Sequence, residues 1–290
     1  MATIERPLEG MTAAVTGASR GIGKAIAKRL ASGGADIVIA ARSLESTSSE
    51  YGGTVFETAD EIRAFGGSVH CLQLDVSDRA SREEFVDTAI RQVGGIDILV
   101  NNAGTSIYKP IGEYDFDVIQ RQIDTYLSGP MHLCNMLVPH MKARGRGRIL
   151  NLGSSSAVRL PPDPPYTDWV KVRGNEVVYS TLKTAMHRFT VGLAAELFGS
   201  GITVNLVAPV RAVSTPGIMA LDMGFSPDHP LCEIEEEIAE AALALVANGD
   251  PMNTGNIAWS YEYLDQIGRS TMSLDGKEVL VERNTASQPA

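Results

Sequence analysis

The stretch Thr16-Gly-Ala-Ser-Arg-Gly-Ile-Gly23 decides the fold, because a β-branched apolar run precedes it and a helical pattern follows it. The run Thr12–Thr16 is typical of a buried strand. After the turn, Ile22, Ile26 and Leu30 recur every four residues, which predicts the apolar face of a helix. Glycines between a strand and a helix let the backbone approach a phosphate, which the helix N-terminus attracts. The stretch therefore predicts a phosphate-binding loop at the start of an α/β fold.

The alternation of strands and helices continues to about residue 207. This rhythm is typical of a parallel sheet flanked by helices, so we predict an α/β fold with a single doubly wound Rossmann-type domain over residues 1–290. Thr54 and Glu57 form a capping-box pattern that opens one of the helices. The expected strands are short β-branched runs: Thr12–Thr16, Asp36–Ala40, Ser68–Leu74, Ile96–Val100, Arg148–Leu152 and Thr203–Val207.

The C-terminal part departs from this rhythm. We expect a helix near Glu235–Val246, a short strand within Gly276–Val281, and a C-terminal extension over residues 265–290 with a frayed polar tail. The acidic run Glu233–Glu237 is interpreted as the solvated first turn of the helix, where the helix dipole favours negative charge.

Composition excludes several classes of protein. With 44% hydrophobic and 21% charged residues among 290, the chain is neither disordered nor collagen-like. A net charge of −10 repels phosphate backbones and anionic lipid, so we expect no nucleic-acid and no membrane partner. The three cysteines are far apart, which predicts reduced thiols and no metal site. No signal-peptide pattern opens the chain and no apolar run approaches the roughly 18 residues that span a bilayer, so a cytoplasmic location is expected.

The end of the second expected strand indicates which dinucleotide the loop binds. An acidic side chain there would accept a hydrogen bond from a ribose 2′-hydroxyl and repel a 2′-phosphate, but this sequence reads Ala40-Ala-Arg-Ser43. Arg42, together with Arg20 of the glycine loop, predicts a clamp on a phosphate dianion. We therefore expect NADP(H) in preference to NAD(H), the alternative being that both arginines are solvated surface charges.

A candidate catalytic group follows in Tyr179-Ser-Thr-Leu-Lys183, where the tyrosine and lysine lie four apart on one helix face. A phenol is a poor base near neutral pH unless a neighbouring ammonium stabilises the phenolate, and Lys183 carries that charge. Ser154 follows an expected strand, at the edge of the sheet where α/β proteins bind ligands. We predict that its hydroxyl holds a substrate oxygen while Tyr179 moves the proton.

In their order along the chain, these motifs resemble the short-chain dehydrogenase/reductase superfamily over about residues 8–260. The resemblance implies hydride transfer between a nicotinamide and a carbonyl or carbinol carbon, with Tyr179 as acid in reduction and base in oxidation. The matching segments are Thr16-Gly-Ala-Ser-Arg-Gly-Ile-Gly23, Asp75-Val76, Asn101-Asn-Ala-Gly104, Ser154, Tyr179-Ser-Thr-Leu-Lys183 and Ile202-Thr-Val-Asn-Leu-Val-Ala-Pro209.

By the same likeness, Asp75 and Val76 flank the adenine, Lys183 bonds the nicotinamide ribose, and the loop Val213–Thr215 faces the carboxamide. A homodimer or homotetramer through the helices bearing Tyr126 and Tyr179 is also implied. The full set of expected cofactor contacts is Gly17, Ser19, Arg20, Gly21, Ile22, Gly23, Arg42, Asp75, Val76, Asn102, Ala103, Gly104, Tyr179, Lys183, Val213 and Thr215.

The chain departs from the family pattern at two single positions. Tyr126 occupies the place of an asparagine that supports a water relay to the lysine, so it is a fourth catalytic candidate: its hydroxyl joins a relay, the relay is rebuilt, or turnover is reduced. Val210 replaces the glycine of a Pro-Gly pair, which suggests an altered loop near the nicotinamide.

A third departure is the long, proline-rich insert over residues 158–176, between Ser154 and Tyr179. Residues 161–173 are expected to form a substrate lid or pocket wall, the alternative being an oligomer contact or a surface loop. The segment Pro216–His229 resembles the family's mobile substrate loop. Its apolar side chains favour a bulky substrate such as a hydroxysteroid-like ketone or a 3-oxoacyl thioester, the alternative being that they pack in the core. Small sugars and aliphatic alcohols stay open as substrates, and the alternative function is an NADP(H)-binding sensor or scaffold with little catalysis.

Overall fold

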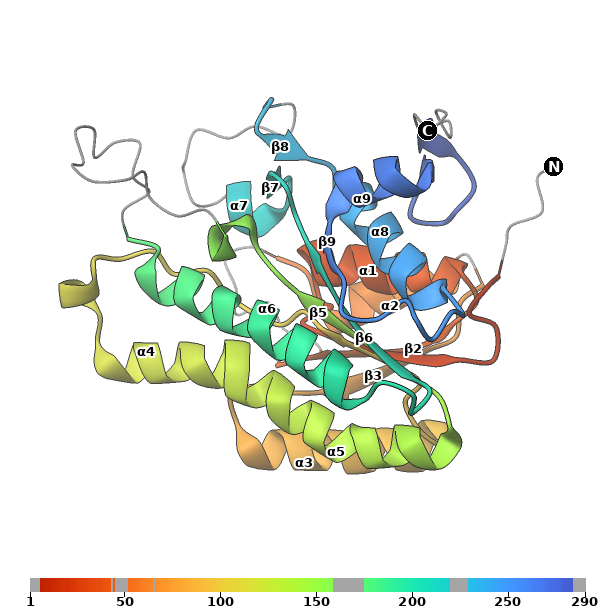
Figure 1. Cartoon of the computed structure of the whole chain (residues 1–290), viewed down its shortest axis with the longest axis horizontal. Coiled ribbons are helices and arrows are strands. Elements are labelled where there is room, and N and C mark those ends of the chain that lie inside the picture. The colour runs from red at the N-terminus through yellow and green to blue at the C-terminus, as the bar shows by residue number, and fades with distance from the viewer. Residues whose placement is uncertain are drawn as a thin grey trace.

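A seven-stranded parallel sheet forms the centre of the molecule, with strand order β3-β2-β1-β4-β5-β6-β9 (Figure 1). The structure is a computed structural model that describes residues 6–42, 44, 52–64, 66–158, 175–219 and 229–283. The strands are β1 (Thr12–Thr16), β2 (Asp36–Ala41), β3 (Val69–Gln73), β4 (Ile98–Asn101), β5 (Gly147–Leu152), β6 (Ile202–Ala208) and β9 (Ile257–Trp259). The predicted doubly wound α/β fold is confirmed.

Helices cover both faces of the sheet because side chains of each strand alternate between them. One face packs on α1, α2, α8 and α9, and the other on α3, α5 and α6. Within β1, for example, Ala13 and Val15 join the first core and Ala14 joins the second. The helices are α1 (Gly21–Ser32), α2 (Val55–Ala64), α3 (Arg79–Val93), α4 (Phe116–Ile123), α5 (Gly129–Arg144), α6 (Val177–Glu196), α7 (Pro216–Met219), α8 (Glu235–Ala247) and α9 (Ser260–Ile267).

Local signals in the sequence fix several helix boundaries. The capping box that opens α2 is present, with Glu57 N donating to Thr54 Oγ1 at 3.0 Å and Thr54 N donating to Glu57 Oε2 at 2.9 Å. The predicted helix at residues 235–246 is α8, one residue longer. The expected solvated acidic turn is wrong for Glu233, which lies before the helix on strand β8 (Cys232–Glu233) and is only 4% exposed.

The C-terminal extension forms a hairpin of β10 (Thr271–Met272) and β11 (Val279–Val281), so the strand predicted within Gly276–Val281 is confirmed. Within the described part of the chain, no helix combines the length and apolar character needed to cross a bilayer.

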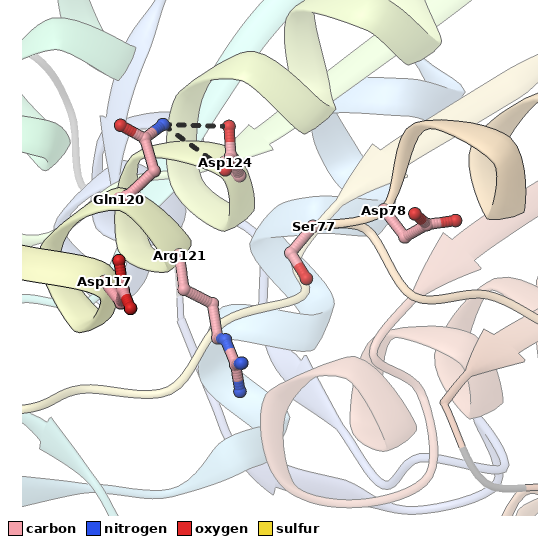
Figure 2. A pocket seen from close by; sticks show the side chains of 6 residues that line it. All are labelled: Ser77, Asp78, Asp117, Gln120, Arg121 and Asp124. Atoms are coloured by element: carbon pink, nitrogen blue, oxygen red, sulfur yellow. Dashed lines mark hydrogen bonds between the residues drawn. The ribbon is translucent and has the colours of Figure 1, made fainter.

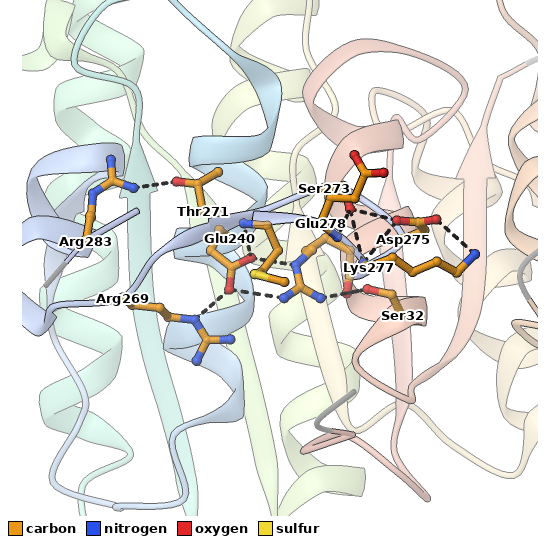
Figure 3. Close-up of polar contacts among 11 residues, drawn as sticks. Ser32, Glu240, Arg269, Thr271, Ser273, Asp275, Lys277, Glu278 and Arg283 are labelled. Atoms are coloured by element: carbon orange, nitrogen blue, oxygen red, sulfur yellow. Dashed lines mark hydrogen bonds and ion pairs between the residues drawn. The ribbon is translucent and has the colours of Figure 1, made fainter. Parts of the chain in front are cut away.

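A buried ion network attaches this hairpin to the rest of the molecule (Figure 3). The carboxylate of Glu240 on α8 is fully buried and accepts hydrogen bonds from Arg29 Nε at 2.6 Å and Arg269 Nε at 2.6 Å. The backbone N–H of Met272 on β10 donates to the same carboxylate at 3.4 Å. One side chain therefore joins α1, α8 and the hairpin.

Removing this carboxylate leaves the Arg29 guanidinium buried without its partner. We expect Glu240→Ala to lower the free energy of unfolding by about 3–5 kcal/mol, measured by urea denaturation. The control is Lys277→Ala, which removes an exposed partner of Asp275 and is expected to cost less than about 1 kcal/mol. Equal losses in the two variants would contradict a structural role for the buried network.

Candidate active site

Ser154, Tyr179 and Lys183 come together where β5 ends against α6. All three are buried, with exposed fractions of 7%, 9% and 6% in that order. A hydrogen bond joins the side chains of Ser154 and Tyr179, and Lys183 Nζ donates to the carbonyl oxygen of Leu152 at 2.8 Å. The fold therefore brings together the three side chains that the sequence singles out.

Burial moves the pKa values of this phenol and this ammonium in opposite directions, because each loses hydration of its charged form. Burial, with a smaller contribution from Tyr108, raises the pKa of Tyr179 to about 12, against the hydrogen bond with Ser154, which lowers it. Burial lowers the pKa of Lys183 to about 8. We expected the lysine charge to lower the pKa of the phenol, but Lys183 Nζ lies 5.8 Å from the Tyr179 ring centre and burial dominates. Tyr179 is thus a neutral phenol at neutral pH, the form that donates a proton.

Tyr126 lies beside the catalytic candidates, on a π-helical turn at Asp124–Ser128 between α4 and α5. Its ring meets that of Tyr179 edge to face, with centroids 5.6 Å apart, and Lys183 Nζ lies 4.9 Å from its ring centre. Burial raises the pKa of its hydroxyl well above the usual range. The ring fills the space next to Gly104, where a Cβ atom would lie 2.4 Å from Tyr126 Cε1. Tyr126 is therefore part of the site, and its role in catalysis stays a prediction.

Two further residues, both on the loop after β4, complete this cluster and were not predicted. The side chain of Ser106 hydrogen-bonds to the hydroxyls of both Tyr126 and Tyr179. The ring of Tyr108 meets that of Tyr179 edge to face, with centroids 5.6 Å apart. The available signal was their position just after the Asn101–Gly104 motif, at the ligand-binding edge of a parallel sheet.

The glycine loop fits a bound pyrophosphate. Gly17 has φ +69°, and a Cβ atom there would lie 2.8 Å from the Cα of Ala103. Helix α1 begins at Gly21, and among the described residues no acidic side chain lies in its first turn and no side chain caps it. The first backbone N–H groups of this helix are therefore in place to donate hydrogen bonds to a bound anion.

Asn102 holds the glycine loop against the end of β4. Its Nδ2 donates to the carbonyl oxygens of Thr16 at 2.8 Å and Gly17 at 3.2 Å, and its backbone N–H donates to Thr16 Oγ1 at 3.0 Å. A Cβ atom on Gly23 would lie 2.3 Å from Asn102 Nδ2, so the helix, the loop and this amide are closely packed. The predicted cofactor segments 17–23 and 102–104 are thus adjacent.

The loop after β6 reaches the same place. A Cβ atom on Gly21 would lie 3.3 Å from Thr215 Cβ, so the predicted carboxamide loop Val213–Thr215 touches the glycine loop. Ser19 is buried and Ile22 packs on the core.

The expected adenine and 2′-phosphate contacts lie at the ends of β2 and β3. Asp75 Oδ1 accepts from Ser77 Oγ at 2.6 Å, and Val76 is buried next to it. Arg42 is exposed at the end of β2, whereas Arg20 Nη1 donates to the carbonyl oxygen of Gly52 at 2.7 Å. The clamp formed by the two arginines stays a prediction.

Both ends of the predicted insert lie at the site, although residues 159–174 fall outside the described residues. Ser156 Oγ donates to Glu176 Oε2 at 2.8 Å, and Thr184 Oγ1 donates to the carbonyl oxygen of Ala157 at 2.9 Å. The predicted lid, and residues 220–228 of the predicted substrate loop, lie outside the described part of the chain.

A polar hollow borders the turn that follows Val76 (Figure 2). Gln120 Nε2 donates to the carboxylate of Asp124 at 3.3 Å across its wall. The lining of this hollow includes neither Ser154 nor Tyr179, so the hollow is separate from the cluster of Ser154, Tyr179 and Lys183. The lining residues are Ser77, Asp78, Asp117, Gln120, Arg121 and Asp124.

Comparison with known proteins agrees with this geometry. The family model for short chain dehydrogenases matches residues 11–222. A hydroxysteroid dehydrogenase-like protein 2 from Danio rerio is 36% identical over 244 residues, covering 82% of this chain and 54% of that protein. A cyclohexanol dehydrogenase from Rhodococcus sp. (strain TK6) is 33% identical over 214 residues, covering 70% of this chain and 74% of that protein. The crystal structure of a blue fluorescent protein from a metagenomic library, in complex with NADPH, superposes with a TM-score of 0.71 at 30% identity, covering 87% of this chain and 97% of that one.

The chain therefore belongs to the short chain dehydrogenase family, a class of oxidoreductases, as its motifs predict. It spans 50% to 59% of the length of the hydroxysteroid dehydrogenase-like relatives that it matches.

The Asn102 amide gives a test of how the glycine loop is held. Asn102→Asp replaces a donor by a carboxylate that faces two carbonyl oxygens, so we expect a loss of about 1–3 kcal/mol in the free energy of unfolding, measured in urea. The matched control is Asn248→Asp, because Asn248 uses its side-chain oxygen to accept from Asp250 N and an aspartate keeps that bond. A loss no larger than that of the control would exclude the amide as the anchor of the loop.

Proposed function

We propose that this protein is an NADP(H)-dependent dehydrogenase/reductase that interconverts a secondary alcohol and a ketone. The observation that carries the proposal is the buried cluster in which Ser154 hydrogen-bonds to Tyr179 and Lys183 lies near the Tyr179 ring, beside a glycine loop suited to a pyrophosphate. A bound nicotinamide supplies or accepts the hydride.

The residues of the chain manage the proton and the substrate oxygen. Ser154 and Tyr179 bind the carbonyl oxygen, and the neutral phenol of Tyr179 donates the proton when the ketone is reduced. The ammonium of Lys183, whose pKa is about 8, stabilises the phenolate that remains. Tyr126 and Tyr108 surround the phenol and keep water from it. In oxidation the phenolate takes the proton back, and a pKa of about 12 makes that form scarce at neutral pH.

The preference for NADP(H) over NAD(H) rests on Arg42. This side chain is exposed at the end of β2, where a carboxylate would exclude a 2′-phosphate. The NADPH complex of the similar blue fluorescent protein supports the proposal. Because the chain carries a net charge of −10, a local cation is needed to bind a cofactor with several phosphate charges.

The substrate class that we favour is a bulky or cyclic apolar ketone, such as a hydroxysteroid-like ketone or a 3-oxoacyl thioester. The aromatic cluster of Tyr108, Tyr126 and Tyr179 supports it, as do the names of the relatives. We further propose a homodimer or homotetramer through α5 and α6, where apolar side chains including Leu127, Met131 and Phe189 line a shallow groove.

The catalytic assignment is tested with Tyr179→Phe, which removes the acidic proton and keeps the ring. We expect turnover of ketones with NADPH to fall by about 10²–10⁴-fold, with the fluorescence titration of NADPH unchanged. Tyr263→Phe is the matched control, since that tyrosine packs in the core cluster of α1 and α8. A Tyr179 variant as active as the parent refutes the assignment. If the parent binds NADPH tightly but turns over no member of a broad panel of ketones and alcohols, the sensor alternative is favoured.

The cofactor preference is tested with Arg42→Ala. Losing a charge-assisted hydrogen bond is expected to raise the Kd of NADPH about 10- to 100-fold and to leave that of NADH within about twofold. Arg79→Ala, which removes an exposed arginine paired with Glu83, controls for the change in net charge. Equal losses for the two cofactors would remove Arg42 from the 2′-phosphate site.

A further inference from the structure

Glu233 is a buried carboxylate on β8, and it lies directly behind the loop that follows β6. Its Oε2 accepts hydrogen bonds from the backbone N–H groups of Val210 at 3.2 Å and Arg211 at 3.1 Å. The side chain of Ser260, at the start of α9, also hydrogen-bonds to it. Among the described residues its Oε1 has no hydrogen-bond partner, although the side chain is only 4% exposed. A buried carboxylate with an unpaired oxygen is costly, so its retention calls for a reason.

The backbone of the same residue pairs with this loop. Strand β7 (Ala212–Val213) runs parallel to β8, with Val213 opposite Glu233, and Ser214 N donates to the Glu233 carbonyl oxygen at 3.0 Å. Each of these strands is two residues long, so few backbone bonds fix the loop. The loop ends at Thr215, which touches Gly21 of the glycine loop. A continuous set of contacts therefore connects the carboxylate to the cofactor site.

We propose that Glu233 is a positioning residue, whose ionised carboxylate holds the loop 210–215 in the conformation that receives the nicotinamide half of the cofactor. The inference rests on the proposed function and names a determinant of cofactor binding within it. Val210 stands where the family has a glycine, and its N–H is also within 3.3 Å of Ser260 Oγ. The side chains of Glu233 and Ser260 thus hold the backbone at Val210, where a valine has different conformational preferences from a glycine.

This arrangement depends on the charge of Glu233. Burial, with a smaller contribution from Glu237, raises the pKa of Glu233 to about 7, against the hydrogen bonds from Ser260 and from the two backbone N–H groups, which lower it. Of the neighbouring charges, Glu237 is paired with Arg283 at 2.9 Å and the Arg211 guanidinium stacks on Tyr261. As the pH falls through about 7 the carboxylate takes up a proton, and its two bonds to backbone N–H groups lose their ionic character and weaken. Binding of the nicotinamide half should therefore weaken on acidification.

The test compares two ligands, NADPH and adenosine 2′,5′-bisphosphate, which lacks the nicotinamide. Their Kd values are measured by calorimetry between pH 6 and pH 8.5 for the parent and for Glu233→Gln. We expect the variant to raise the Kd of NADPH about 10-fold and to leave that of the bisphosphate within about twofold. In the parent, the Kd of NADPH divided by that of the bisphosphate should rise more steeply as the pH falls through about 7 than it does in the variant. The comparison of parent and variant cancels the titration of the phosphate monoesters, because both proteins are given the same two ligands.

Glu236→Gln, on the first turn of α8, is the matched control and should behave as the parent. Ser260→Ala removes the hydroxyl partner of the carboxylate and should also raise the Kd of NADPH relative to that of the bisphosphate. This variant provides the test if Glu233→Gln does not fold. A parent that binds neither ligand refutes the proposed function and the inference with it. A parent that binds both, with an unchanged Kd ratio in the Glu233 and Ser260 variants, refutes the inference alone.

Discussion

The reversal of strand order between β1 and β4 is the constraint on which the site depends. From β1 the chain builds the sheet first to one side, through β2 and β3, and then to the other, through β4. The loops after these two neighbouring strands therefore diverge, and their backbones leave room for a ligand at the carboxyl edge. The amide of Asn102 joins these two loops by donating to the carbonyl oxygens of Thr16 and Gly17. Two later strands each bring one candidate site residue to the same edge of the sheet: Ser154 follows β5, and Thr215 lies on the loop after β6.

Burial sets the electrostatics of that edge more strongly than pairing does. Tyr179 and Lys183 are both buried, and loss of hydration raises the pKa of the phenol and lowers that of the ammonium. The two shifts move the pKa values apart, so the phenol stays protonated at neutral pH and the lysine loses its charge above about pH 8. The aromatic rings of Tyr108 and Tyr126 both meet the ring of Tyr179 edge to face. These rings therefore contact the group that we propose as the proton donor.

The sequence predicted features that are local along the chain and missed those that depend on distant contacts. Six strands follow from β-branched runs, but β9 has three residues and too little pattern to detect. The pairing of Tyr179 with Lys183 follows from helical spacing alone. Ser106 carries no spacing signal, because its partners are tyrosines on two separate elements. The acidic turn that adjoins Glu233 predicts a solvated helix residue there, whereas its burial depends on packing against a loop and α9.

The two single-residue departures from the family pattern each meet a partner that is distant in sequence. Tyr126 replaces an asparagine, and its hydroxyl is hydrogen-bonded by Ser106 while its ring lies against Gly104, the one residue type without a colliding Cβ. Val210 replaces a glycine, and its N–H is held by Glu233 and Ser260. In both places the changed residue is contacted by a side chain on another element, which the local motif does not contain. A changed residue in a motif is therefore weak grounds for predicting loss of activity unless the residues that contact it are also known.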